Sequence, residues 1–201
     1  MKRTILALAS ILSSSAVRAQ APNDSASHGP APTTSSSEYR FADIAWGSPA
    51  DTVKAALQRE GIAFITTDSL GDLTFAGAIF QRKAAVIASM IDGRLARTVV
   101  GFEKMSRSTL PLYRAIKREL IAKYGKPTKS TEVFLPPYYE GDGNEEGAFL
   151  TRKAVFLSRW RSAQTGERLS LLIDERPGVI VVYESAAWPN DAARKPKSRR
   201  N

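Results

Sequence analysis

The stretch FADIAWGSPADTVKAALQREG, residues 41–61, decides the fold because it leads from an apolar segment into an amphipathic helix with terminal signals at both ends. We expect Ser48 to be the N-cap and Pro49 the first helical residue, where its missing N–H costs nothing. Asp51 then faces the positive end of the helix. Gly61 fits the position just after a helix, which favours a left-handed backbone. The stretch therefore predicts one helix that ends before residue 61.

Short β-prone segments follow this helix at residues 62–66, 73–80, 84–91 and 95–102. The last two are separated by Asp92-Gly93, a pair that favours a type I′ turn between antiparallel strands. The helix is therefore expected to lead into an antiparallel meander.

A second segment, STLPLYRAIKRELIAKYGKP at residues 108–127, repeats this arrangement. Ser108 or Thr109 is the expected N-cap, and Gly125 ends the helix. The apolar stripe recurs every four residues and consists of Leu112, Ile116, Leu120 and Tyr124. Further strands are predicted at residues 131–135, 148–160, 168–174 and 179–185.

The predicted fold class is α+β, with two helix-plus-antiparallel-meander units at residues 39–104 and 105–187. Both helices are expected on one face of an antiparallel sheet, because each must bury its apolar stripe. Residues 155–157 and 179–183 are apolar on both sides of their strands. Either loops cover the second face, or that face receives a partner or a second copy of the chain.

The two ends of the chain differ from this domain, which we place at residues 39–189. Residues 1–19 have the basic start, apolar middle and small-residue end of a signal peptide, and the apolar run is shorter than the ~20 residues of a membrane-spanning helix. Residues 20–38 lack large apolar side chains and are expected to be a disordered linker. Residues 190–201 are predicted to be a disordered basic tail. The protein is therefore expected to be exported, either periplasmic or secreted, and not transmembrane after processing.

The composition excludes several classes of function. The chain has no cysteine and a single histidine, His28 in the linker, so thiol chemistry, disulfides and a Ser-His-Asp triad in the domain are excluded. The net charge is +9, but five basic residues lie in the last eleven, which weakens a nucleic-acid interpretation. No phosphate-binding or nucleophile motif is present. We expect no enzyme activity and no cofactor; the alternative is an envelope enzyme that uses an Asp/Glu pair.

A resemblance is carried by the apolar-Trp-Gly-Ser start at residues 41–48, the hairpin glycine Gly93 and the Lys123-Tyr124-Gly125 end of the second helix. In these features residues 39–187 resemble uncharacterised secreted bacterial α+β domains. Their tandem units are similar to those of the β-lactamase inhibitor protein and of small outer-membrane-assembly lipoproteins. The resemblance implies a protein-binding scaffold without catalysis. The chain lacks the lipidated cysteine of the lipoproteins, so membrane anchoring is not implied.

The most unusual local segment is the acidic loop at residues 136–147, PPYYEGDGNEEG. Carboxylates alternating with glycines could hold calcium, although their spacing does not match an EF-hand, and we predict no metal site. A solvated connector and a partner-recognition loop are the other interpretations, and exposed tyrosines favour recognition. The candidate binding residues here are Tyr138, Tyr139, Glu140, Asp142, Glu145 and Glu146.

Two further parts of the chain are candidate sites. Trp160 stands between two arginines, so it is either a core residue or an outward-facing cation–π element. The tail could contact anionic envelope surfaces through Arg194, Lys195, Lys197, Arg199 and Arg200. Taken together, the sequence predicts an exported, non-enzymatic domain that binds a protein or another macromolecule of the cell envelope, with nucleic acid disfavoured.

Overall fold

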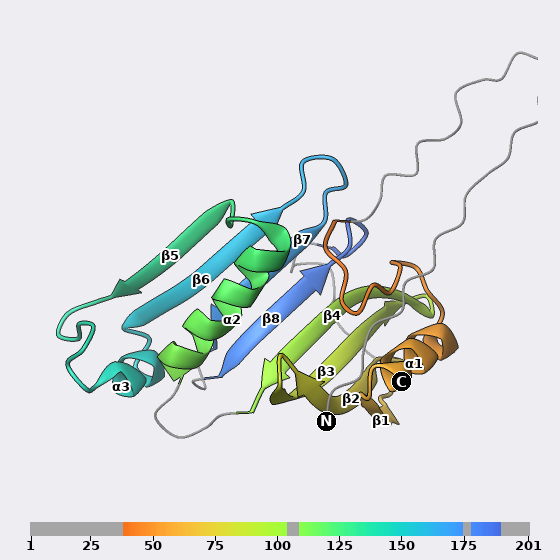
Figure 1. Ribbon diagram of the computed structural model, residues 1–201, viewed down its shortest axis with the longest axis horizontal. Helices are drawn as coiled ribbons and strands as arrows, with labels where there is room; N and C mark the ends of the chain where they lie inside the picture. The colour runs from red at the N-terminus through yellow and green to blue at the C-terminus, as the bar shows by residue number, and fades with distance from the viewer. Residues whose placement is uncertain (1–37, 104–108, 175–177, 190–201) are drawn as a thin grey trace, which may run out of the picture. The chain divides into compact units, whose positions relative to one another are not determined.

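An antiparallel sheet of eight strands, in the order β1-β2-β3-β4-β8-β7-β6-β5, forms the body of the protein (Figure 1). It is seen in a computed structural model that describes residues 38–103, 109–174 and 178–189. The fold is mixed α+β and mostly sheet, in agreement with the predicted class. The predicted signal peptide, the predicted linker up to residue 37 and the predicted tail from residue 190 lie outside the described residues.

The helices and strands follow one another in an order close to that predicted. Their bounds are α1 Ala50–Arg59, β1 Ala63–Thr67, β2 Leu73–Ile79, β3 Arg82–Ile91, β4 Arg94–Phe102, α2 Thr109–Tyr124, β5 Lys129–Phe134, α3 Glu145–Leu150, β6 Ala154–Arg161, β7 Arg168–Ile173 and β8 Val179–Glu184.

The prediction of a strand over residues 148–160 was wrong in its first half. Residues 145–150 form the short helix α3, and β6 begins only at Ala154. Glu145 and Glu146 lie in the first turn of α3, where acids stabilise the positive helix end. Ala148 and Phe149 are buried, so the apolar run that suggested a strand instead forms the inner side of a helical turn.

The predicted start of the first helix was also one residue too early. Pro49 is the N-cap with an extended backbone, α1 begins at Ala50, and no side chain caps it. The predicted end is confirmed. Gly61 has a φ of +74°, its N–H donates to Gln58 O, and the N–H of Ile62 donates to Leu57 O. This pair of bonds is a Schellman motif, and the buried side chains of Leu57 and Ile62 accompany it.

The turn between β3 and β4 is the predicted hairpin turn. Asp92 and Gly93 have φ angles of +50° and +72°, as a type I′ turn requires. The turn between β2 and β3 uses the same geometry, with φ angles of +49° at Phe80 and +59° at Gln81. Neither residue favours a positive φ, which is why this second turn carries no signal in the sequence.

The helix α2 buries the predicted stripe. Leu112, Tyr113, Ile116 and Leu120 are all buried, and Tyr124 is partly buried. The ring of Tyr113 meets that of Phe156 on β6 edge-on at 5.6 Å, and the ring of Tyr124 meets that of Tyr183 on β8 at 6.4 Å. In Figure 1, α2 accordingly lies across β7 and β8. The centre of the sheet below is the pairing of β4 with β8.

Candidate functional site

The strand β6 has two different sides because successive side chains of a strand point to opposite faces of the sheet. Phe156, Ser158 and Trp160 are buried toward α2, and the indole N–H of Trp160 donates to Gly125 O at 2.8 Å. Leu157, Arg159 and Arg161 therefore point to the other side. We call that side the arginine face; its residues on β4, β8, β7 and β6 include Arg97, Leu157, Arg159, Arg161, Arg168, Leu172 and Val182.

One row of charged side chains crosses this face at one end of the strands. Arg161 lies opposite Arg168, Arg168 opposite Glu184, and Glu184 opposite Arg97. The Glu184 carboxylate bridges two cations: it accepts from Arg168 Nε at 2.9 Å and lies 3.4 Å from Arg97 Nε. Arg97 also lies 5.2 Å from the Trp188 ring centre. The row thus has three guanidinium groups and one carboxylate.

The rows further along the strands become apolar. Leu157 lies opposite Leu172, and Leu172 opposite Ile180. Val133 and Val155 form another facing pair, and these residues are 40% and 43% exposed. The apolar surface continues toward β3 through Val182, Val99 and Ile87. The arginine face therefore changes from cationic to apolar along the direction of its strands.

A shallow hollow of about 660 Å³ lies over this face. Its lining includes Arg97, Arg168 and Glu184 at the charged end and Leu157, Leu172 and Val182 on the floor. A ligand lying in it would meet guanidinium groups at one end and aliphatic side chains at the other.

Two cross-strand pairs on this face place like charges directly opposite one another. Lys129 on β5 faces Arg159, and Arg161 faces Arg168. Such pairs destabilise a sheet. The guanidinium groups of Arg159 and Arg161 make no ion pair or hydrogen bond with the described residues. The face therefore retains uncompensated positive charge at a cost in stability.

A second polar cluster lies between α2 and the strands β5 and β6, and we call it the polar seam. Its members are Tyr113, Lys117, Ser130, Glu132 and Ser158. The Tyr113 hydroxyl and Ser158 Oγ lie 2.9 Å apart, as do the two serine oxygens. Lys117 Nζ donates to Ser130 Oγ at 2.9 Å and to the Glu132 carboxylate. Burial raises the pKa of Tyr113 to about 12, and the Glu132 carboxylate adds to the effect.

The polar seam has a serine beside a lysine, but not the arrangement of a nucleophile and its base. The Lys117 ammonium donates to Glu132, so its nitrogen has no lone pair to take a proton from Ser130. The same bonds satisfy buried polar groups where α2 meets the edge of the sheet. The seam is better explained as a closure of the core than as a catalytic site.

Two of the four carboxylates of the acidic loop accept from the loop's own backbone. Asp142 accepts from the N–H groups of Tyr139 at 3.1 Å and Asn144 at 2.7 Å, and Glu145 accepts from that of Gly141 at 2.9 Å. Glu146 accepts from the Thr109 N–H at the start of α2. Within the described ranges, no group of three or more metal-ligating side chains is placed to hold an ion.

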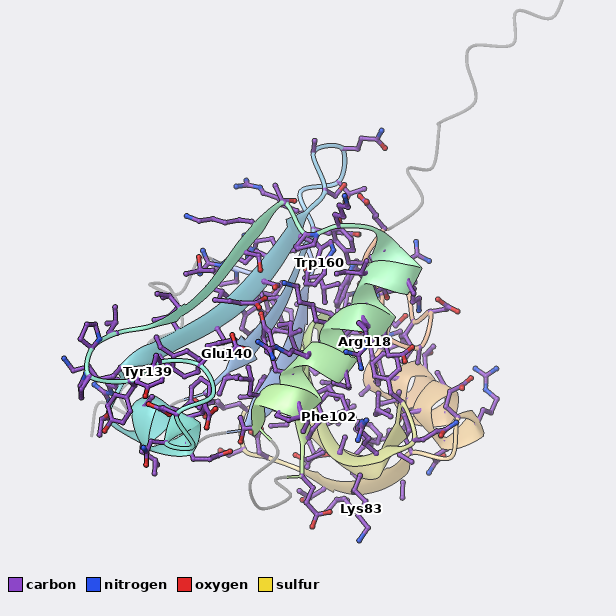
Figure 2. The ribbon with its side chains drawn as sticks, turned by 60° about the vertical axis from the view of Figure 1, so that its left-hand side comes forward. Lys83, Phe102, Arg118, Tyr139, Glu140 and Trp160 are labelled. Atoms are coloured by element: carbon purple, nitrogen blue, oxygen red, sulfur yellow. The ribbon has the colours of Figure 1, made fainter. Side chains whose placement is uncertain are left out.

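The remaining candidates of the loop face outward or toward α2. Glu140 forms an ion pair with Arg114 on α2 at 2.6 Å, and Tyr139 is 66% exposed (Figure 2). Tyr138 is half-buried. Trp160, by contrast, is 1% exposed and meets the far end of α2, so an outward-facing role for it does not fit. Arg114 and Gly125 are separated by roughly 16 Å along the helix axis, so the structure does not bring the loop and Trp160 together.

Sequence reasoning missed the arginines of the site. Arg159 and Arg161 were noticed only as neighbours of Trp160. Their alternation with buried residues and the turn at residues 162–167 could have placed Arg161 opposite Arg168. The tail residues Arg194, Lys195, Lys197, Arg199 and Arg200 lie outside the part of the chain that the structure describes.

Comparison of the chain with family models, with curated proteins and with solved structures gave no match. Among the described residues, no helix is both long and apolar enough to cross a membrane.

Proposed function

We propose that the protein is an exported, non-enzymatic binding domain that recognises another protein through its arginine face. The observation that carries the proposal is the combination on one sheet surface of exposed aliphatic side chains with uncompensated arginines. Exposed apolar patches rimmed by polar residues are typical of interaction sites. Arginine is enriched where proteins meet, since it offers both charge and an apolar stem.

The order of helices and strands along the chain is consistent with a binding scaffold. One helix precedes β1–β4, and a second precedes β5–β8. On this interpretation both units place their helices on the same side of the sheet. The contacts of α2 with Phe156 and Tyr183, and of Lys54 on α1 with Phe64, agree with it. Phe64 in turn packs edge-on against the fully buried Phe75. The arginine face is then the side left for a partner.

The size of the face suits a protein better than a small ligand. Eight strands spaced about 4.8 Å apart and about 20 Å long present roughly 700 Å², close to the ~800 Å² that each partner contributes to a standard interface. A small ligand is normally covered on most of its surface, which a shallow hollow cannot do. The residues that define the arginine face include no aromatic side chain, and single-stranded nucleic acids usually stack their bases on such rings.

Site-specific photo-crosslinking in cells that produce the protein tests the proposal. A photoreactive amino acid is placed at Ile87 or Val155 on the arginine face, and at Ala55 or Ala122 on exposed helix positions as matched controls. We expect the first two positions, and not the controls, to give the same discrete protein adduct. The substitution Leu172→Asp should abolish the adduct. Equal crosslinking from all four positions, or none from the face, would overturn the proposal.

A further inference from the structure

Resting on this proposed function, we infer that the partner presents an acidic segment followed by an apolar one, held in an extended conformation along β6. Its carboxylates bind at the cationic corner, which we define as Lys129, Arg159, Arg161 and Arg168. Its apolar side chains cover Leu157, Val155 and their neighbours.

The first support is the energetic cost of the cationic corner. Each of its two facing pairs brings like charges together, where an aliphatic or acidic residue on one strand would stabilise the sheet. An anionic partner would attract both members of each pair and so offset their repulsion. The same charge makes a second copy of this chain unsuitable, because two arginine faces packed together would place guanidinium groups against guanidinium groups.

The second support is Glu184, which shows how a carboxylate is held on this face. It lies between Arg97 and Arg168 in the charged row and contacts the Nε of each. The next cation in the row, Arg161, lies opposite Arg168, which already holds Glu184, so Arg161 has no carboxylate opposite it on β7. A carboxylate from a partner can pair with Arg161 in the same way.

The spacing of the corner and the floor sets the pattern of the segment. Arg161, Arg159, Leu157 and Val155 follow one another on the same side of β6, about 6.5–7 Å apart. Every second residue of an extended chain has the same spacing. A matching segment therefore carries two acids and then two aliphatic residues at alternate positions, which corresponds to the peptide Glu-Thr-Glu-Thr-Leu-Thr-Val.

Fluorescence anisotropy with a labelled form of this peptide and the full-length protein measures the interaction. Three control peptides change one property each. The first has Lys in place of both Glu residues, the second has Gln in place of both Glu residues, and the third has Thr in place of Leu and Val. We expect binding of the first peptide, at least tenfold weaker binding of each control, and weakening with added salt because exposed charges are screened. Peptides with Lys or Gln that bind equally well would overturn the inference, as would no binding of the acidic peptide at millimolar concentration.

Protein variants separate recognition from folding. Arg159→Glu and Arg161→Glu should each weaken binding of the acidic peptide at least tenfold, whereas Arg118→Glu on the exposed side of α2 should leave it unchanged. Arg161→Glu should also raise Tm, because it places a carboxylate opposite Arg168. Loss of binding with a higher Tm cannot be caused by unfolding. Unchanged binding in both variants of the arginine face would overturn the inference.

Two results distinguish this inference from the proposed function. If crosslinking from Ile87 and Val155 persists in Arg161→Glu, and the acidic peptide does not bind the original protein, the face binds a protein of other chemistry, and only the inference fails. Anionic vesicles are the alternative occupant. If they bind as tightly as the peptide and lose binding in the same variants, the corner is a general anion site and the inference is overturned.

Discussion

The two faces of β6, β7 and β8 are made from alternate residues of the same strands, yet they follow opposite rules. On the side of α2, Trp160, Leu169, Leu171 and Tyr183 are almost fully buried, and the indole N–H of Trp160 donates to Gly125 O. On the arginine face, most neighbours one residue away are at least partly exposed, and they include repelling cations. The side chains that stabilise the fold therefore lie mainly on the side of α2. The arginine face retains repelling cations that selection for stability alone would not favour.

The largest expected effect is a loss of folding stability at alkaline pH, which arises from buried tyrosines and not from the arginine face. Burial raises the pKa of Tyr39 and of Tyr113 to about 12 and that of Tyr183 well above its ordinary value of 10.0. A raised pKa means that the folded state favours the neutral phenol, so this stability is present below pH 10 and is lost as the pH rises toward 12. At about 1.4 kcal/mol per pKa unit, Tyr39 and Tyr113 account for on the order of 5 kcal/mol.

Urea unfolding at several pH values between 8 and 12 checks this expectation. The double variant Tyr39→Phe/Tyr113→Phe is the control, since it removes both ionisable hydroxyls and should flatten the loss of stability. A urea midpoint that stays constant in the original protein up to pH 12 would show that these hydroxyls are not buried in solution.

The next contrast uses adjacent residues of β7. Leu171 is fully buried toward α2, and Leu172 lies on the arginine face and is half-buried. Leu171→Ala should reduce the free energy of unfolding by about 2–5 kcal/mol, because it leaves a cavity in a packed core. Leu172→Ala should cost about 1 kcal/mol, since less apolar area is lost from contact. Equal losses in chemical denaturation would mean that the two faces are equally packed.

The polar seam is expected to contribute less. Tyr113→Phe removes a hydroxyl that lies within hydrogen-bond distance of Ser158, whose side chain is fully buried. We expect a loss of about 1 kcal/mol in the free energy of unfolding, because Ser158 keeps its contact with Ser130. Ser158→Ala in the same background should then add little. Additive losses from the two substitutions would indicate that they do not share one network.

On the arginine face, truncation should have the opposite sign. Arg161→Ala removes one member of a like-charged facing pair, so the free energy of unfolding should rise by about 0.2–1 kcal/mol at low salt. The gain should shrink at high salt as the repulsion is screened. A clear loss of stability would show that Arg161 has a structural role that the contacts described above do not reveal.

The smallest effect concerns the acidic loop. Asp142 and Glu145 already accept N–H groups of the loop itself, so calcium would have to replace these bonds. Millimolar calcium should leave Tm unchanged both in the original protein and in Asp142→Asn. A calcium-dependent rise in Tm that is lost in Asp142→Asn would establish a metal site.

The elements with local signals could be predicted from the sequence. Gly61 and Gly125 ended their helices as expected, and Asp92-Gly93 formed its turn, because each depends on backbone preferences of one or two residues. Residues 148–150 could not be assigned, since a short apolar run suits a strand or one turn of helix equally well. The hairpin at Phe80-Gln81 is held in place by the pairing of β2 with β3, against the preference of its own residues.

The site was less predictable than the fold because its residues come from strands far apart in the chain. Arg97 and Glu184 lie opposite each other only because β4 pairs with β8, and no local sequence pattern predicts that pairing. Arg161 and Arg168 lie in one hairpin and could have been paired. The composition of the acidic loop suggested a binding site, yet its carboxylates mostly bind groups of its own backbone and of α2.

The pairing of β4 with β8 has a consequence for the order of folding. The strand in the middle of the sheet is the last one in the chain, so the long-range contacts that join the two halves can form only when β8 is available. Non-local pairing of this kind slows folding and leaves strand edges exposed until it is complete. The row from Arg161 to Arg97 spans this junction. A chain that has not yet formed this pairing therefore has no complete arginine face, because the face exists only in the finished fold.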